Sequence, residues 1–256
     1  MRLIKQFLYG VLFIAILVAL IWGFYNMFLK STSSCFDNKK NQNETDIDCG
    51  GSCISCELKN IKPLVLGQTQ LYSGDRIFSV SVPVENTNPQ FGIENFSYKF
   101  SIYDKDGNVL ETVEDKSFIY PSEKKDLISA GMRITNGYPD HADFKIDESS
   151  IKWENPENFY APAFELKDVT ASQDNDVVTI SGYVSNVNNF VISKAIADVF
   201  VLDKNGQKIN ASRTELNNIG QFRIENFKIL IPILKSQRDS IDLDSSAKTV
   251  YIEILK

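Results

Sequence analysis

Four cysteines in one short segment are the residues whose types and spacing most directly suggest chemistry. They are Cys35, Cys49, Cys53 and Cys56, and the rest of the 256-residue chain has no cysteine. Outside the cytoplasm, an even number of cysteines in a small polar segment is typical of disulfides. A Cys53–Cys56 bridge would close a strained ring, so pairings such as Cys35 with Cys53 and Cys49 with Cys56 are favoured. Gly50 and Gly51 would permit the positive-φ backbone that such crowding requires.

Oxygen-bearing side chains between the first two cysteines suggest a second kind of site, a calcium loop. The candidate ligands are Asp37, Asn41, Asn43, Glu44, Asp46 and Asp48. Calcium prefers roughly six to eight oxygen ligands, but no glycine follows the third ligand and no glutamate closes an EF-hand loop. A solvated disulfide loop without metal is an equal alternative, and a zinc site would require reduced thiols. Apart from calcium, we expect no cofactor.

The segment between Cys35 and Cys56, CFDNKKNQNETDIDCGGSCISC, resembles a short module of bacterial surface proteins. The shared pattern is C-x-D-x-x-x-N-x-x-E-x-x-x-D-C-G-G-x-C-x-x-C. Asn38 stands where that module usually has glycine. The resemblance implies a small stapled module that lies just outside a membrane anchor or between β-sandwich domains.

No other group of side chains matches a known catalytic arrangement. His141 is the only histidine, and we expect it to be an ordinary loop residue. The sequence has no phosphate-binding glycine pattern and no metalloprotease or serine-hydrolase motif. Acidic pairs such as Asp174 with Asp176 are expected to be solvated. The sequence therefore predicts that the protein is not an enzyme.

An apolar stretch, residues 7–29, precedes the cysteine segment and determines where that segment lies relative to a membrane. It contains no charged residue, and as a helix rising about 1.5 Å per residue it is long enough to cross a bilayer. Arg2 and Lys5 precede it and only Lys30 follows closely, which predicts a cytoplasmic stub, residues 1–6, with the rest of the chain outside. The stretch is long and does not end in small residues, so an uncleaved anchor is favoured over a signal peptide.

The chain beyond this stretch is acidic. The whole sequence has a net charge of −6, and residues 1–30 hold three basic residues and no acidic one, which leaves −9 for the remainder. Nucleic-acid binding requires concentrated lysine and arginine, so we expect no nucleic-acid partner. An apolar content of 43% with 17 Phe and 10 Tyr suffices for packed cores.

The remaining residues contain an internal repeat. The sequence from Val80, VSVPVENTNPQFGIENFSYKFSIYDKDGNVL, aligns with VTISGYVSNVNNFVISKAIADVFVLDKNGQKI from Val178, and one loop differs by a single residue. An alternating trio of apolar residues predicts a strand with one face on a core in each copy. The trios are Tyr98, Phe100 and Ile102 in the first copy, and Ala197, Val199 and Val201 in the second.

Turn residues separate the predicted strands. Asp106-Gly107 and Asn205-Gly206 predict hairpin turns, because both positions can adopt positive φ, and Asn136-Gly137 is a further such pair. Pro83 predicts an edge strand or a bulge. Segments that begin at Phe144 and Ile241 are similar and predict matching closing strands.

The strand Phe100-Ser101-Ile102-Tyr103-Asp104 resembles the motif of FxLYD domains, with isoleucine in place of leucine. In that family and in the similar LEA-type domains a strand ending in N-x-N or N-x-S precedes the motif, as in 86–88 and 186–188 here. The resemblance implies small extracytoplasmic β-sandwiches without known catalytic residues.

Together these observations predict an all-β protein with an N-terminal transmembrane helix, a small disulfide-stapled module and two tandem immunoglobulin-like β-sandwiches. The expected parts are a linker at 30–34, the module at 35–56 and the domains at 57–160 and 161–256. We expect a single-pass cell-membrane protein that contacts the bilayer through residues 7–29 and an unidentified envelope protein outside the cell. A calcium- or redox-responsive stalk is the alternative.

Overall fold

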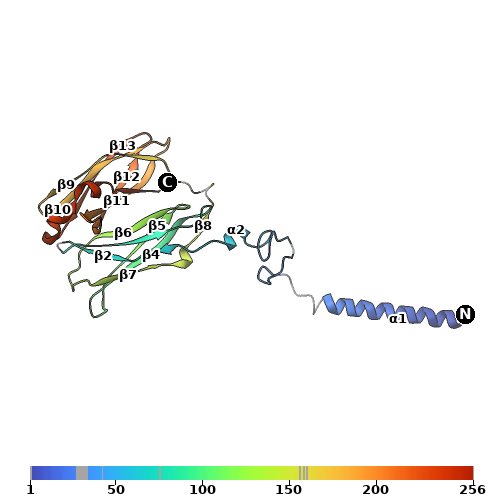
Figure 1. The fold of residues 1–256 in the computed structure, drawn as a ribbon. Coiled ribbons are helices and arrows are strands. Elements are labelled where there is room, and N and C mark those ends of the chain that lie inside the picture. Colours follow the sequence, from blue (N-terminus) through green and yellow to red (C-terminus); the bar gives the residue numbers. More distant parts are fainter. Residues whose placement is uncertain are drawn as a thin grey trace. The chain divides into compact units, whose positions relative to one another are not determined.

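The computed structural model describes residues 2–26, 34–41, 43–74, 76–155, 157, 159 and 161–255. The chain divides into two compact units, Met1–Ile61 and Lys62–Lys256, which we call the N-terminal unit and the β unit. The β unit contains both copies of the repeat. Each unit is described by itself below (Figure 1).

The N-terminal unit begins with α1 (Arg2–Phe24). The helix starts five residues before the predicted Phe7, and residues 27–29 of the predicted stretch lie outside the described part of the chain. Between Ile4 and Phe24 the mean hydropathy is 2.6, and none of these residues is buried. Such a helix is long and apolar enough to be a membrane anchor or a signal sequence. The second helix, α2 (Cys56–Lys59), is one turn long.

The β unit contains two repeats with the same order of strands. Repeat 1 has β1 (Val65–Leu66), β2 (Gln70–Ser73), β3 (Phe78–Glu85), β4 (Gly92–Tyr103), β5 (Val109–Ile119), β6 (Lys124–Met132), β7 (His141–Ile146), a 3-10 helix (Glu148–Ser150) and β8 (Trp153–Glu154). Repeat 2 has β9 (Phe164–Asp174), β10 (Val177–Asn186), β11 (Ile192–Asp203), β12 (Lys208–Ile219), β13 (Ile224–Pro232), a 3-10 helix (Lys235–Ser240), β14 (Ile241–Asp242), α3 (Leu243–Ala247) and β15 (Tyr251–Leu255).

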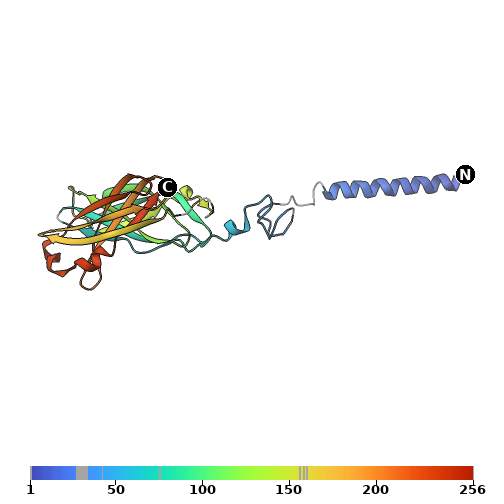
Figure 2. The same cartoon turned by 90° about the horizontal axis from the view of Figure 1, so that it is seen from above.

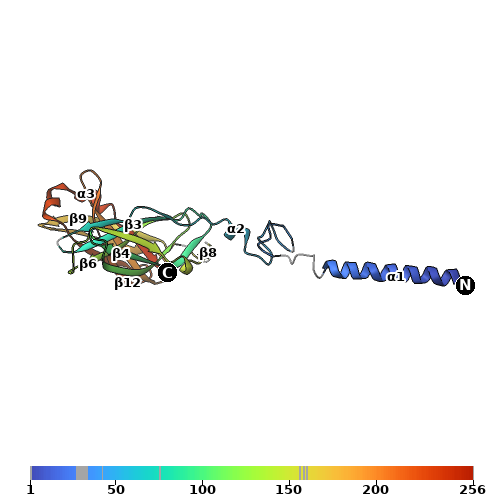
Figure 3. The ribbon, with the colours of Figure 1, turned by 90° about the horizontal axis from the view of Figure 1, so that it is seen from below.

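Each repeat forms two antiparallel sheets. In repeat 1, β3 pairs with β6, β1 and β2, while β4 pairs with β5, β7 and β8. In repeat 2, β10 pairs with β9 and β13, while β11 pairs with β12, β14 and β15. The predicted closing strands are therefore present in both repeats. Figure 3 shows α3 near β9, which it contacts.

Each repeat has its own apolar core, to which both of its sheets contribute. Val80, Val82 and Val84 of β3 face the aromatic residues of β4 in repeat 1. The equivalent side chains of β10 and β11 form the core of repeat 2. Both predicted trios of alternating residues are buried in these cores, which confirms the predicted inner faces of β4 and β11. Burying each such side chain contributes about 1.5–3 kcal/mol.

The two predicted hairpin turns are present, between β4 and β5 and between β11 and β12. In each turn only the glycine has positive φ, 81° at Gly107 and 78° at Gly206. The aspartate at the start of the turn stabilises it, because Asp104 Oδ1 accepts hydrogen bonds from the backbone N–H groups of Asp106 and Asn108. A one-residue register shift follows beside each turn. The glycine thus forms a bulge instead of one half of a two-residue turn.

Two expectations about local structure are wrong. Pro83 lies on the central strand β3, paired with Asp126 of β6. The backbone nitrogen of Pro83 faces the side of β3 where β1 has ended, so no strand there needs an N–H donor from it. The Pro83 carbonyl faces the same side and accepts the Gly67 N–H. Asn136-Gly137 belongs to the connection between β6 and β7, which lie in different sheets, so it is no hairpin.

The two repeats are packed against each other. Strand β12 contacts β2, β3 and β6. Tyr72 and Ile128 of repeat 1 form a buried cluster with Phe200 and Ala211 of repeat 2, and the rings of Tyr72 and Phe200 meet edge to face. Figure 2 shows the strands of repeat 2, in orange and red, overlying the cyan and green strands of repeat 1. Residues 62–256 therefore form one compact unit.

Candidate functional site

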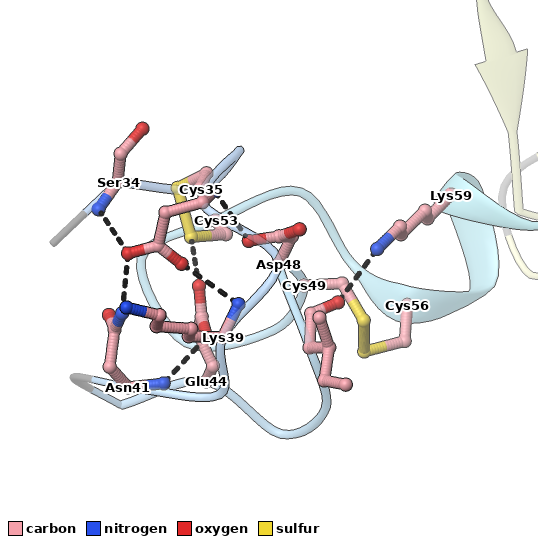
Figure 4. Close-up of a disulfide and its surroundings, with 12 residues drawn as sticks. Ser34, Cys35, Lys39, Asn41, Glu44, Asp48, Cys49, Cys53, Cys56 and Lys59 are labelled. Atoms are coloured by element: carbon pink, nitrogen blue, oxygen red, sulfur yellow. Dashed lines mark hydrogen bonds between the residues drawn. A yellow bond between two sulfur atoms is a disulfide. The ribbon is translucent and has the colours of Figure 1, made fainter.

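Two disulfides hold the cysteine segment. They join Cys35 to Cys53 and Cys49 to Cys56, with Cα–Cα distances of 5.6 and 4.8 Å. This is the pairing that the sequence favoured. The bridges interleave along the chain, and Figure 4 shows the segment folded around them. Since Cys49 is the segment's only buried apolar side chain in the described part, the bridges take the place of a core.

Asp48 organises the start of the segment. Its buried carboxylate accepts the backbone N–H groups of Asp37 and Asn38, each at 3.0 Å. Asn38 has a φ of 55°, a left-handed conformation that asparagine tolerates better than most residues. Asn38 therefore adopts a conformation that is otherwise typical of glycine.

Glu44 and Asp37 are also engaged by donors within the segment. Glu44 Oε2 accepts the Asn41 N–H at 2.9 Å. Its Oε1 lies 3.3 Å from Cys53 Sγ, a contact without a hydrogen bond because the disulfide sulfur carries no proton. The pKa of Asp37 lies below its usual value. Desolvation raises this pKa, but hydrogen bonds from the Asn41 side chain and from the Lys39 N–H lower it by more.

The structure gathers four of the six predicted calcium ligands. Asp37, Asn41, Glu44 and Asp48 share one hydrogen-bond network, whereas Asn43 is exposed and Asp46 Oδ1 accepts the neighbouring Ile47 N–H. Most of the carboxylate oxygens of the network already accept N–H donors, so the loop is ordered by its own groups. Among the described residues, Asn41 Oδ1 is buried without a hydrogen-bond partner. Calcium binding remains a prediction.

The two glycines of the segment are required by close approach. Gly50 and Gly51 have φ values of 80° and 62°, as predicted. A Cβ atom on Gly51 would lie 2.1 Å from the carbonyl oxygen of Asn43, and one on Gly50 would lie 2.3 Å from Thr45 Oγ1. Any other residue at either position would push the second half of the segment away from the first.

In the β unit, the N-x-N residues form a hydrogen-bonded junction, which we call the node of each repeat. In repeat 1, Asn86 Nδ2 donates to the carbonyls of Phe91 and Tyr120 at 2.7 and 2.9 Å. Its Oδ1 accepts both the N–H and the side-chain amide of Asn88. Asn88 in turn exchanges two hydrogen bonds with the backbone of Lys62. Asn86 is almost fully buried, so the node joins four chain segments inside the protein.

The node of repeat 2 has the same connections. Asn186 Nδ2 donates to the carbonyls of Phe190, Ile219 and Gly220, and its Oδ1 accepts both donors of Asn188. Asn188 exchanges two hydrogen bonds with the backbone of Ala163. The extra residue of repeat 1 therefore lies in the loop between its N-x-N asparagine and the following phenylalanine. The role of these motifs in both repeats is structural.

Two buried ion pairs lie at the contact between the repeats. Lys125 of β6 lies 3.2 Å from Glu253 of β15, with side-chain exposures of 0% and 3%. The contact lacks hydrogen-bond geometry, and the Lys125 ammonium also lies 3.9 Å from the centre of the Phe118 ring. Such a pair is held by charge and by the cation–π contact in a low-dielectric environment.

The second pair joins Asp198 of β11 to Arg213 of β12 through two hydrogen bonds of 2.9 and 3.0 Å. Arg213 also reaches Asp115 of repeat 1 at 3.8 Å. Burial raises the pKa of Asp198 to about 6, although the Arg213 guanidinium acts in the opposite direction. Sequence reasoning missed both pairs, because a charged residue at every second position of a strand usually faces water.

Comparison with known proteins gives no family for this chain. No family model matches the sequence, and no curated protein matches it. Among solved structures, one match is the crystal structure of red sea bream transglutaminase, with 8% sequence identity and a TM-score of 0.25. The match covers 75% of this chain and 30% of that one. At this level of similarity it carries no argument about fold or function.

A cavity of about 210 Å³ lies between the two repeats, beside the chain that connects β8 to β9. Its described walls are Phe118, Tyr120, Glu123, Ala161, Pro162, Phe164, Tyr251, Ile252, Glu253 and Ile254. The Tyr120 hydroxyl donates to the carbonyl of Ile254, and the Tyr251 hydroxyl donates to Glu123. Burial raises the pKa of both phenols, so they remain protonated donors. These described walls include no serine, cysteine or histidine.

His141 is not in a loop, contrary to the prediction. It is the first residue of β7, exposed, with its ring stacked on Tyr103 at 5.1 Å and its Nδ1 beside Asp140. The stacking partner and the neighbouring carboxylate account for its position. Neither contact places it beside a nucleophile.

Proposed function

We propose that this protein is a single-pass, membrane-anchored, extracytoplasmic structural or interaction protein of the cell envelope. In this proposal α1 spans the bilayer, residues 1–6 are cytoplasmic, and two immunoglobulin-like β-sandwiches are displayed outside. Each repeat has two antiparallel sheets that both contribute to one core, which supports the sandwich architecture. The partner would be another envelope protein, and no nucleic acid is involved.

The observation that carries the proposal is the exposure of α1. A soluble protein buries the apolar face of a helix, yet none of the residues from Ile4 to Phe24 is buried. A bilayer supplies the missing apolar environment. The two disulfides support an oxidising location for the segment that follows.

A redox-responsive stalk is the second candidate, and the interleaved disulfides favour it. They stand in for a core in the cysteine segment, so reduction would release most of its order. The segment could then change from a compact spacer to an extended one. Calcium would act on the same segment in the alternative version of this hypothesis.

Protease protection tests the topology of the full chain. An epitope tag is placed at each end, the protein is produced in a bacterium, and spheroplasts are treated with protease before and after detergent. We expect the C-terminal tag to be lost at once and the N-terminal tag to survive until detergent is added. Loss of the N-terminal tag from the membrane fraction without protease would show signal cleavage and contradict the anchor.

The interaction role is tested separately on intact cells by mild crosslinking followed by mass spectrometry. A specific adduct of the β unit with another envelope protein would support it. A wild-type chain that gives no adduct in oxidising medium, but becomes cleavable within residues 35–56 on reduction, would favour the stalk.

A further inference from the structure

Four exposed apolar side chains surround the node of repeat 2. They are Val187, Val191, Phe222 and Ile224, with exposures of 39%, 53%, 66% and 53%. We call this group the apolar tip. At the corresponding positions repeat 1 has Thr87, Gly92, Ser122 and Lys124. The same fold is therefore built without an apolar tip in one repeat and with it in the other.

The node holds the segments of the apolar tip together. Asn186 donates to the carbonyl of Phe190, the neighbour of Val191, and its own N–H donates to the carbonyl of Arg223, the neighbour of Phe222. Ile224 pairs with Ser185 in the register of β10 and β13. The four side chains consequently project from adjoining segments at one end of repeat 2.

The backbone does not select phenylalanine at position 222. Phe222 has a φ of 54°, and Ser122 in the equivalent turn has a φ of 56°. A left-handed conformation favours glycine or asparagine, and a large exposed aromatic ring adds no packing there. Because neither the turn nor the core explains this side chain, an external apolar environment is the remaining physical reason for it.

Both nodes lie at the end of the β unit where the chain enters. Lys62, the first residue of the unit, is bonded to Asn88 of the node in repeat 1. The cavity described above connects the two nodes. It is lined by Tyr120, whose carbonyl accepts from Asn86, and by Phe164, which pairs with Asn186. The apolar tip is therefore at the tethered end of the β unit.

Charges of both signs border the apolar tip, since Arg223 precedes Ile224 and the exposed Glu225 follows it. Arg223 lies between Phe222 and Ile224, and repeat 1 has Glu123 at this position. An exposed arginine among apolar side chains suits the phospholipid headgroup region, where its stem lies on apolar groups and its guanidinium meets phosphate. A purely apolar partner would offer no anionic group to the Arg223 guanidinium.

We propose that the apolar tip inserts into the headgroup–acyl boundary of a phospholipid bilayer. This inference rests on the proposed anchoring, because the tether keeps a bilayer at high effective concentration and lets a small apolar area suffice. Repeat 1 lacks the equivalent side chains and makes no such contact. The bilayer would then fix the orientation of the β unit at a second point besides α1.

Site-specific photocrosslinking in lipid nanodiscs tests the proposal with the full, oxidised chain. Benzoylphenylalanine replaces Phe222 in one sample, Ser122 in a matched control and Leu17 of α1 in a third, and lipid adducts are measured by mass. We expect the yield of phosphatidylglycerol or phosphatidylcholine adduct at 222 to exceed that at 122 by about tenfold. Equal yields, or a mass equal to two protein chains, would overturn the proposal. Absence of adduct at Leu17 would instead overturn the anchor.

A second variant separates the apolar tip from the probe. Benzoylphenylalanine is placed at Asn189, and V187T, F222S and I224K are introduced together, each taken from repeat 1. These side chains are compatible with the backbone because repeat 1 carries them on the same turns, and thermal unfolding verifies the fold. We expect the lipid adduct at 189 to fall about tenfold. An unchanged yield in the folded variant would contradict the proposal.

Discussion

The two repeats of the β unit share their internal connections and differ on their surfaces. Asn86 and Asn186 make equivalent hydrogen bonds, with one more in repeat 2, to the carbonyl of Ile219, and the two hairpins use aspartate and glycine in the same way. In contrast, Lys99 of β4 is exposed, while Asp198 at the equivalent place in β11 is buried against repeat 1. A few polar connections are thus sufficient to conserve the fold while the outer faces of the strands change.

This difference shapes the contact between the repeats. The outer face of β11 carries Asp198 and Phe200, whereas β4 carries Lys99 and Ser101 at these positions. Phe200 enters the cluster with Tyr72 and Ile128, and Asp198 engages Arg213. On the side of repeat 2, the contact therefore depends on residues that have no counterpart in repeat 1.

The largest effect is expected from breaking the buried pair between the repeats. Lys125→Ala leaves the Glu253 carboxylate buried without its cation, which should lower the free energy of unfolding by about 3–5 kcal/mol. The neighbouring Lys124→Ala is the control, because its ion pair with Glu85 is exposed and is worth about 0–1 kcal/mol. Urea denaturation in detergent measures both. Equal effects would mean that the buried contact does not stabilise the unit.

Removing each node asparagine tests whether the two repeats use it equally. Asn86→Ala and Asn186→Ala each leave several buried carbonyls and N–H groups unpaired, with an expected loss of about 2–4 kcal/mol. Similar losses in both variants, measured by thermal and urea unfolding, would support the equivalence. Asn189→Ala, which changes an exposed residue in the same loop, serves as the control. A loss at one node only would show that the repeats differ in their interior as well.

The pH dependence of stability should distinguish Asp198 from its exposed counterpart. Its pKa is about 6 in the fold and near 4 when unfolded, so the folded state holds an extra proton between these values. This group alone therefore makes stability fall as pH rises from about 4 to 6, by the order of 2 kcal/mol. The difference in slope between wild type and Asp198→Asn measures it. Lys99→Ala should leave the slope unchanged.

The smallest effect on the β unit is expected from the disulfides. Replacing Cys49 and Cys56 by serine should open the cysteine segment to proteolysis, because it has no core of its own. The unfolding temperature of the β unit should remain unchanged, since the two compact units have separate interiors. Limited proteolysis and calorimetry of the same sample report both outcomes. A lower unfolding temperature would reveal coupling between the units.

Sequence reasoning found the features that depend on local order. The alternation in β4 follows from the two-residue period of a strand, and the repeat follows from alignment of the sequence with itself. The pairing of the cysteines follows from the short spacing between Cys53 and Cys56, which disfavours a bridge between them. It misplaced Pro83, because a proline is compatible with a central strand when the neighbouring strand is interrupted opposite it. It also missed Lys125 with Glu253, since partners so far apart in sequence meet only through the packing of the repeats.

The point at which the chain enters the β unit has a mechanical consequence. Tension along the chain from the preceding residues reaches the unit at Lys62, which is held by two hydrogen bonds of 2.9 and 2.8 Å to Asn88. Behind it, β1 pairs with β3 over only two residues and is separated from β2 by an interruption. Under tension we therefore expect residues 62–66 to detach before the longer pairing of β3 with β6 is loaded.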